Sequence, residues 1–114
     1  MQLQIQSPHF VPNDALVNEV TTKLDRLEKM YDRIEKCTVM LKHEKNDEQK
    51  GYIVEVRLAV PKEDLFAKES TESYSRSLDN VIDDLKKQLI KHKEKLKGTD
   101  KTKEKISVEE LSSE

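Results

Sequence analysis

Residues 74–97 place the strongest structural constraint on this 114-residue chain, because their apolar side chains recur at steps of three and four. This spacing puts them along one face of an α-helix, which must then pack against a core. The apolar positions are Tyr74, Leu78, Val81, Ile82, Leu85, Leu89 and Leu96. The sequence therefore predicts a long amphipathic helix here, capped by Ser70 or Thr71 and ended by Gly98.

The charged residues of this segment are sorted along its length. Aspartates occupy the first half and lysines the second half, where only Glu94 opposes them. Lys87, Lys91 and Lys95 follow at steps of four, and like charges at that spacing destabilise a helix by roughly 0.2–0.5 kcal/mol per pair. The helix dipole favours lysines only in the last turn, so it does not account for this run. Such a helix often meets an anionic surface, and we expect a nucleic-acid partner.

The net charge of −2 argues against that partner, because most nucleic-acid-binding proteins are basic overall. The charge is segregated, however. Between Lys86 and Lys105 nine lysines accompany three acidic residues, so this stretch carries +6 and the remainder −8. A surface divided in this way can steer a polyanion to one face. Hydrophobic residues make up 34% of the chain, which indicates one small domain over 1–98 and a flexible charged tail over 99–114.

The first part of the chain predicts a strand followed by a helix. Residues 2–6 alternate polar and apolar, as a short half-buried strand does. Asn13 is a favourable N-cap for a helix that continues to about Tyr31. The apolar positions of this helix are Leu16, Val17, Val20, Leu24, Leu27 and Met30.

Three further strands are predicted at about 36–43, at 52–60 and near 65–69, joined by a hairpin loop at 44–51 and a tight connection at 61–64. The order is β-α-β-β-β-α. The sheet has one apolar and one polar face, so both helices must cover the same face in a two-layer α+β sandwich. A right-handed crossover makes the first two strands parallel, and the last three form an antiparallel meander of the four-stranded mixed sheet.

The sequence signals of an enzyme are weak, and no segment has the length and apolarity of a membrane span. Cys37 is the single cysteine and falls on the inward face of a strand, as a core residue does. His9, His43 and His92 lack metal-ligand spacing, and two glycines cannot supply a phosphate-binding loop. No apolar run approaches the length of a membrane span, and the N-terminal residues lack the basic region and apolar run of a signal peptide. We expect a cytoplasmic protein that is not an enzyme, with no cofactor, metal or small-molecule substrate.

Basic side chains on the two predicted helices form the strongest candidate site. The candidate RNA-binding residues are Lys23, Arg26, Lys29, Lys86, Lys87, Lys91 and Lys93. Helices side by side on one sheet face would border a basic groove, and we expect the row of Lys87, Lys91 and Lys95 to lie along it, close to Lys23 and Arg26. The alternative is that these long side chains cover the edges of the core with their methylene groups. Aromatic residues are only 4% of the chain, so recognition should depend on shape and phosphates rather than on bases.

Three segments resemble the ribosome hibernation promoting factor family, also described as sigma-54 modulation or ribosome-associated inhibitor proteins. They are MQLQIQS at 1–7, ALVNEVTTKLDRLEKMYDRI at 15–34 and ESYSRSLDNVIDDLKKQLIKHKEKLK at 72–97. The resemblance covers residues 1–98 and is to the short members of the family. Without the first strand, the predicted order also resembles a double-stranded-RNA-binding domain.

The resemblance to hibernation factors implies a translation inhibitor that binds the decoding channel of the small ribosomal subunit. Such a protein blocks mRNA and tRNA in stationary phase, and its partner is the rRNA of the decoding region. The basic positions of the family map onto Lys23, Arg26, Lys87, Lys91 and Lys93, and more weakly onto Lys86 and His92. Residues 99–114 are too short for the dimer-forming second domain of long members, so we expect a monomer when the protein is free.

A hypothesis from a different class is a protein-interaction module whose Lys-rich helix binds an acidic protein partner. The turn VPKEDLFAKE at 60–69 is more acidic than we expect for a tip that faces an RNA channel. Salt dependence separates the two hypotheses, because a protein that neutralises phosphates loses affinity steeply as salt rises.

Overall fold

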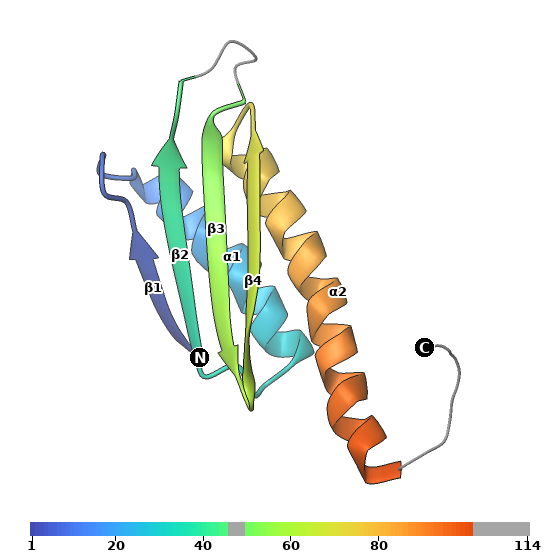
Figure 1. The fold of residues 1–114 in the computed structure, drawn as a ribbon. Coiled ribbons are helices and arrows are strands. Elements are labelled where there is room, and N and C mark those ends of the chain that lie inside the picture. The colour runs from blue at the N-terminus through green and yellow to red at the C-terminus, as the bar shows by residue number, and fades with distance from the viewer. Residues whose placement is uncertain (46–49, 102–114) are drawn as a thin grey trace.

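The computed structural model describes the backbone of residues 1–45 and 50–101 and the side chains of residues 1–45 and 50–96. Its elements follow the predicted β-α-β-β-β-α order. They are β1 (Gln2–Gln6), α1 (Asp14–Met30), β2 (Lys36–His43), β3 (Tyr52–Val60), β4 (Glu63–Thr71) and α2 (Tyr74–Lys101). The predicted α+β class is confirmed, with four strands in one mixed sheet and two helices behind it (Figure 1).

The sheet has the strand order β1-β2-β3-β4. β1 and β2 are parallel, with Leu3 beside Cys37, and α1 forms the crossover between them. β2 pairs antiparallel with β3, and β3 pairs antiparallel with β4, as the meander requires. One edge of the sheet is therefore β1 and the other is β4, and in Figure 1 α2 follows the β4 edge.

The core lies between the helices and one face of the sheet. Leu24 and Leu27 of α1 and Leu85 and Leu89 of α2 are fully buried in it. Alternate residues of the central strands point into the same layer, since each strand turns every second side chain to one face. The buried strand residues include Cys37, Val39, Leu41, Val54, Val56, Leu58, Leu65 and Ala67.

Cys37 lies in this core as the sequence predicts. The residue has no exposed surface, and burial raises the pKa of its thiol to about 12. A thiol that stays protonated in an apolar environment is a poor nucleophile and a poor metal ligand. Cys37 is therefore a small core residue.

The predicted limits of α2 are wrong at both ends. Ser70 and Thr71 belong to β4, where they pair with Ile53 and Tyr52 of β3, so they cannot cap the helix. Ser73 is the cap instead, since its hydroxyl accepts a hydrogen bond of 3.1 Å from the backbone N–H of Arg76. At the other end the helix continues past Gly98 to Lys101. A single glycine costs a helix only about 1 kcal/mol and does not oblige it to stop.

β4 is longer than the predicted 65–69, because the connection from β3 contains only two residues, Pro61 and Lys62. Proline presets the backbone for the first position of a tight turn, and Lys62 then adopts a φ of 75°. Glu63 and Asp64 consequently pair with Val60 and Ala59 instead of forming the turn. This register brings the carboxylate of Glu63 to the edge of the sheet that α2 covers. Of the predicted tail, residues 99–101 continue α2 and the rest lies outside the described residues.

Candidate nucleic-acid interface

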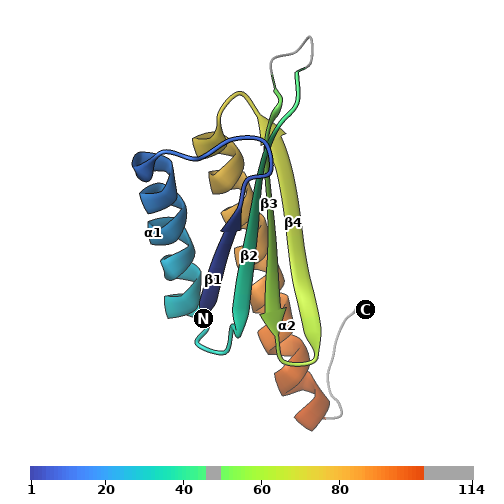
Figure 2. The same ribbon diagram turned by 90° about the vertical axis from the view of Figure 1, so that its left-hand side faces the viewer.

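The two helices lie side by side and run in the same direction. Glu19 contacts Ser75, Lys23 contacts Asp79 and Tyr31 contacts His92, so positions advance together along both helices. In Figure 2 both helices begin at the top of the view and descend. The N-terminal halves are therefore adjacent, and so are the C-terminal halves. The sorted charges of α2 consequently divide the surface between the helices into two ends.

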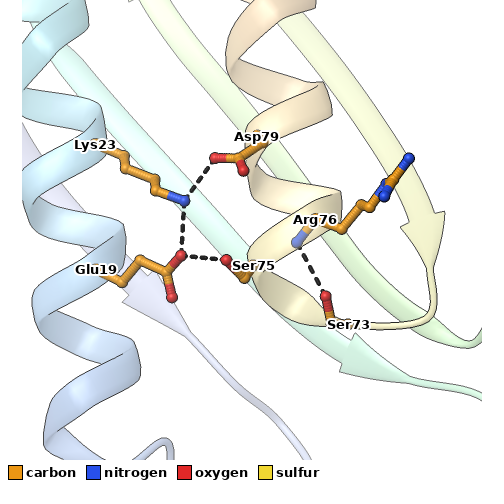
Figure 3. A network of polar contacts seen from close by, with 6 residues as sticks. All are labelled: Glu19, Lys23, Ser73, Ser75, Arg76 and Asp79. Carbon is orange, nitrogen blue, oxygen red and sulfur yellow. Dashed lines mark hydrogen bonds and ion pairs between the residues drawn. The ribbon is translucent and has the colours of Figure 1, made fainter.

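The N-terminal end of this surface holds a chain of polar contacts between α1 and α2 (Figure 3). The ammonium group of Lys23 donates to Glu19 Oε2 at 2.7 Å and to Asp79 Oδ1 at 2.5 Å. The hydroxyl of Ser75 donates to the same Glu19 oxygen at 2.5 Å. One lysine and two carboxylates thus bind each other across the gap between α1 and α2. We call Glu19, Lys23, Ser75 and Asp79 the interhelical network.

The pKa values of the network reflect this pairing. Hydrogen bonds from Lys23 and Ser75 lower the pKa of Glu19 below its usual 4.5. Burial opposes the charged form of Lys23, but its hydrogen bonds to Asp79 and Glu19 outweigh that effect and raise its pKa. The side chain of Lys23 is only 19% exposed. Lys23 therefore fixes the spacing of the helices, and its charge is already matched by two carboxylates.

A groove of about 290 Å³ opens between the helices, from this network toward their C-terminal halves. Its lining residues are Lys23, Arg26, Asp79, Ile82, Asp83 and Lys86. Arg26 and Lys86 are exposed, and within the described part of the chain neither takes part in an ion pair. Lys93 continues this side of α2, with its ammonium group 6.0 Å from the ring centroid of Tyr31 at the end of α1. We call Arg26, Lys86 and Lys93 the open basic end.

The predicted row of Lys87, Lys91 and Lys95 does not line the groove, and that part of the prediction is wrong. Lys95 points to the other flank of α2, where its ammonium group lies 3.4 Å from Glu63 of β4. Lys91 precedes it by one turn and therefore shares that side of the helix. Lys87 and Lys91 are exposed and lie outside the residues that form the groove. Each residue turns the helix by about 100°, so Lys86 faces α1 and Lys87 does not.

Lys29 is exposed near the end of α1 and does not line the groove either. The spacing of Lys23, Arg26 and Lys29 explains this position, because steps of three fall 60° short of a full turn. The row therefore winds away from α2 as α1 proceeds. The structure thus brings Lys23, Arg26 and Lys86 together and leaves Lys29, Lys87 and Lys91 on neighbouring exposed surface.

His92 is buried, so the implied role for it as an rRNA contact is wrong. The residue is 1% exposed, and its Nδ1 contacts the carboxylate of Glu63. That contact, with Lys95, lowers the pKa of Glu63. Nε2 of His92 and the hydroxyl of Tyr31 are both buried and have no hydrogen-bond partner among the described residues. Leu85, Leu89 and His92 follow one another at steps of four and three, the spacing of one helix face. This spacing could have predicted that His92 is buried despite its charged neighbours.

No group of three metal-ligating side chains gathers within the described residues. The helices of that part of the chain also lack an apolar stretch that could cross a membrane.

The sequence profile of a family described as sigma 54 modulation protein / S30EA ribosomal protein matches residues 3–97. The ribosome hibernation promoting factor of Klebsiella oxytoca is 34% identical over 97 residues, which are 85% of this chain and 98% of that relative. The protein of the same name from Azotobacter vinelandii is 35% identical over 95 residues, or 83% of this chain and 85% of the relative.

Two solved structures share the fold. A ribosomal subunit interface protein from Coxiella burnetii has a TM-score of 0.73 at 20% identity, over 82% of this chain and 98% of its own. The N-terminal domain of Protein Y from Thermus thermophilus has a TM-score of 0.64 at 20% identity, over 77% and 94%. The family match includes α1, β2, β3 and β4 and most of β1 and α2. Family membership agrees with the expectation of a binding protein that is not an enzyme. The chain belongs to the sigma 54 modulation protein / S30EA ribosomal protein family.

Proposed function

We propose that this protein is a ribosome hibernation factor that binds the small ribosomal subunit through the open basic end of its two helices. It occupies the decoding channel, excludes mRNA and tRNA, and keeps ribosomes inactive in stationary phase. The relatives named ribosome hibernation promoting factor support the ribosome as partner, since they match this chain over nearly its whole folded part. A protein that acts on ribosomes works in the cytoplasm, which agrees with the location expected from the sequence.

The observation that carries the proposal is the pairing state of the cations. Lys23 is neutralised inside the interhelical network, whereas Arg26 and Lys86 line the same groove without an ion-pair partner in the described residues. Unpaired cations on two adjacent helices can bind successive phosphates and release the counterions of an RNA backbone. Arginine adds a planar group that can bind a phosphate through two N–H donors.

The remaining predicted contacts fit around this centre. Lys93 extends the open basic end toward the end of α1, where it lies over Tyr31. Lys29, Lys87 and Lys91 are exposed beside it and would bind phosphates on either side of the groove. Lys23 acts indirectly, by holding α1 and α2 at the spacing that this surface needs.

Sedimentation with purified ribosomal subunits tests the proposal. The protein should travel with the small subunit through a sucrose gradient at low salt and stay at the top of the gradient without subunits. Added to a cell-free translation reaction, it should inhibit in proportion to its ratio to ribosomes and saturate near one copy per ribosome. Inhibition at a small fraction of one copy per ribosome would contradict a mechanism that blocks the channel by occupancy.

Sedimentation with the same purified subunits at several salt concentrations distinguishes a ribosomal RNA partner from an acidic protein partner. Binding that depends on rRNA should survive removal of weakly attached ribosomal proteins and should weaken steeply as salt rises. Binding that follows an acidic protein fraction, with a shallow dependence on salt, would favour the protein-interaction hypothesis instead.

A further inference from the structure

Within residues 1–45 and 50–101, no helix or further strand covers the face of the sheet opposite α1 and α2. In Figure 1 this face is turned to the viewer, with both helices behind the strands. Its side chains are those that alternate with the buried positions of each strand. They include Gln4, Gln6, Thr38, Met40, Glu55, Arg57, Phe66 and Lys68. The sheet therefore presents a second surface that the two-helix site does not use.

An exposed aromatic ring stands on this surface. Phe66 of β4 is 42% exposed, although most large apolar side chains of the described residues are in the core. Arg57 of β3 is its direct cross-strand partner, and the guanidinium carbon lies 5.1 Å from the centre of the ring. Thr38 and Gln4 continue the same row across β2 and β1. One row thus combines a ring, a planar cation, a hydroxyl and an amide.

A shallow hollow of about 220 Å³ lies beside the ring. It is lined by Gln6, Thr38, Met40, Glu55, Arg57 and Phe66. The amide and hydroxyl groups can donate and accept hydrogen bonds, while the ring and the guanidinium group offer flat surfaces for stacking. A planar heterocycle with polar edges fits this combination better than an aliphatic side chain does.

The charge of the face complements an anion. Lys36, Lys42, Arg57 and Lys68 lie on its alternating positions, against the carboxylates of Glu55 and Asp64. Lys42 and Lys68 share the single carboxylate of Glu55, at 3.0 and 3.9 Å. Arg57 lies 4.0 Å from Asp64, and both side chains are more than half exposed. The face is therefore cationic although the whole chain has a net charge of −2.

We propose that this sheet face binds single-stranded RNA, with one unpaired base stacked on Phe66 and Arg57 and the neighbouring phosphates held by the surrounding lysines. Stacking needs a base whose face is free, so a duplex cannot use this surface. The inference rests on the proposed function and adds a second RNA contact to it. A protein bound between two segments of RNA would contact one with its helices and the other with its sheet.

Binding of RNA oligonucleotides to the full chain tests the inference without a ribosome. The probes are a fluorescent single strand of about ten nucleotides and the duplex of the same sequence. Phe66→Leu should weaken binding of the single strand by about tenfold and leave duplex binding unchanged, because leucine keeps apolar volume but cannot stack. Phe66→Tyr should retain the affinity of the parent. Val11→Ala is the matched control, since Val11 is an exposed apolar residue in the connection between β1 and α1.

The arms of the experiment separate the two proposals. The double change Arg26→Glu plus Lys86→Glu should weaken duplex binding and small-subunit binding, which tests the two-helix site alone. Equal binding of the single strand by the parent and Phe66→Leu would overturn the sheet-face inference and leave the proposed function standing. Analytical ultracentrifugation tests whether the face binds a second copy of the chain instead. A parent that self-associates and a Phe66→Leu variant that does not, with equal RNA binding by both, would also overturn the inference.

Discussion

The two ends of the surface between α1 and α2 carry the same residue types and use them differently. In the interhelical network Lys23 is enclosed by Glu19 and Asp79, at 2.7 and 2.5 Å. Further along the two helices, Arg26 and Lys86 line the groove without such partners in the described part of the chain. A basic residue in a predicted binding site can therefore either form ion pairs that connect two helices or contact the ligand. The ion-pair partners of the residue distinguish these two roles, and its position in the sequence alone does not.

The largest expected effect follows from reversing the charges of the open basic end. Arg26→Glu with Lys86→Glu should weaken binding to the small subunit by about 100-fold at moderate salt, because each lost phosphate contact removes counterion release. Both side chains are exposed, so the free energy of unfolding should change by about 0.5 kcal/mol at most. The measurements are subunit sedimentation and urea denaturation. The control is Lys45→Glu with Lys62→Glu, two exposed lysines in the connections after β2 and β3 that do not line the groove. Equal loss of binding in the control would show a mere effect of net charge.

Reversal of Lys87 and Lys91 should have a smaller effect on binding. These exposed lysines lie beside the groove, so Lys87→Glu with Lys91→Glu should weaken subunit binding by about tenfold. Removing their repulsion should raise the free energy of unfolding by a few tenths of a kcal/mol, roughly 0.2–0.5. Thermal unfolding and sedimentation of the same preparation check both parts. A loss of binding larger than that of the Arg26 and Lys86 pair would move the centre of the site to the outer row.

Removal of Lys23 should affect folding more than binding. Lys23→Met keeps the aliphatic stem but leaves Glu19 and Asp79 without their shared cation, which should destabilise the fold by about 1 kcal/mol. Affinity for the small subunit should stay within about threefold of the parent at temperatures where both are folded. Denaturant titration and sedimentation measure the two quantities. A large loss of affinity with unchanged stability would make Lys23 a phosphate contact after all.

The network should also show itself in the pH dependence of stability. Glu19 has a lowered pKa in the folded protein, so its ionised form stabilises the fold above its unfolded value of about 4.5. This contribution is lost as pH falls through the lowered folded pKa. Glu19→Gln should therefore be less stable than the parent at pH 7, and the gap should narrow progressively below about pH 4.5. Urea denaturation across this range measures the gap, and a gap that is independent of pH would contradict the role of the ionised carboxylate.

The fold could be predicted from the sequence because its signals are local. The stripe of Leu78, Leu85 and Leu89 specifies a helix face, and the alternation in β3 specifies a strand with one buried side. The parallel pairing of β1 and β2 then follows from the crossover rule. The start of α2 was less predictable, since Ser70 and Thr71 can either cap a helix or extend β4, and pairing with β3 decides between them.

The site was predicted only in part because it depends on the phase of two helices about their axes. The sequence identifies the basic residues, but the choice between Lys86 and Lys87 as the residue facing α1 depends on how Ile82 and Leu85 settle in the core. The partners of Lys23 were also hidden, because Asp79 is 56 residues away in the chain. His92 is found within a charged run of the sequence, yet its ring is buried, and the carboxylate of Glu63 at the β4 edge of the sheet is its polar partner.

The most direct test of the account is the salt dependence of small-subunit affinity for two matched single variants, Lys23→Gln and Lys86→Gln. Each removes one positive charge from the same groove. Because the slope of log K against log salt counts the phosphates neutralised, Lys86→Gln should flatten it by about one unit. Lys23→Gln should leave the slope of the parent unchanged, since this lysine is already paired within the protein. A slope flattened by Lys23→Gln and unchanged by Lys86→Gln would contradict the account, in which Lys23 belongs to the interhelical network and Lys86 of the open basic end contacts phosphate.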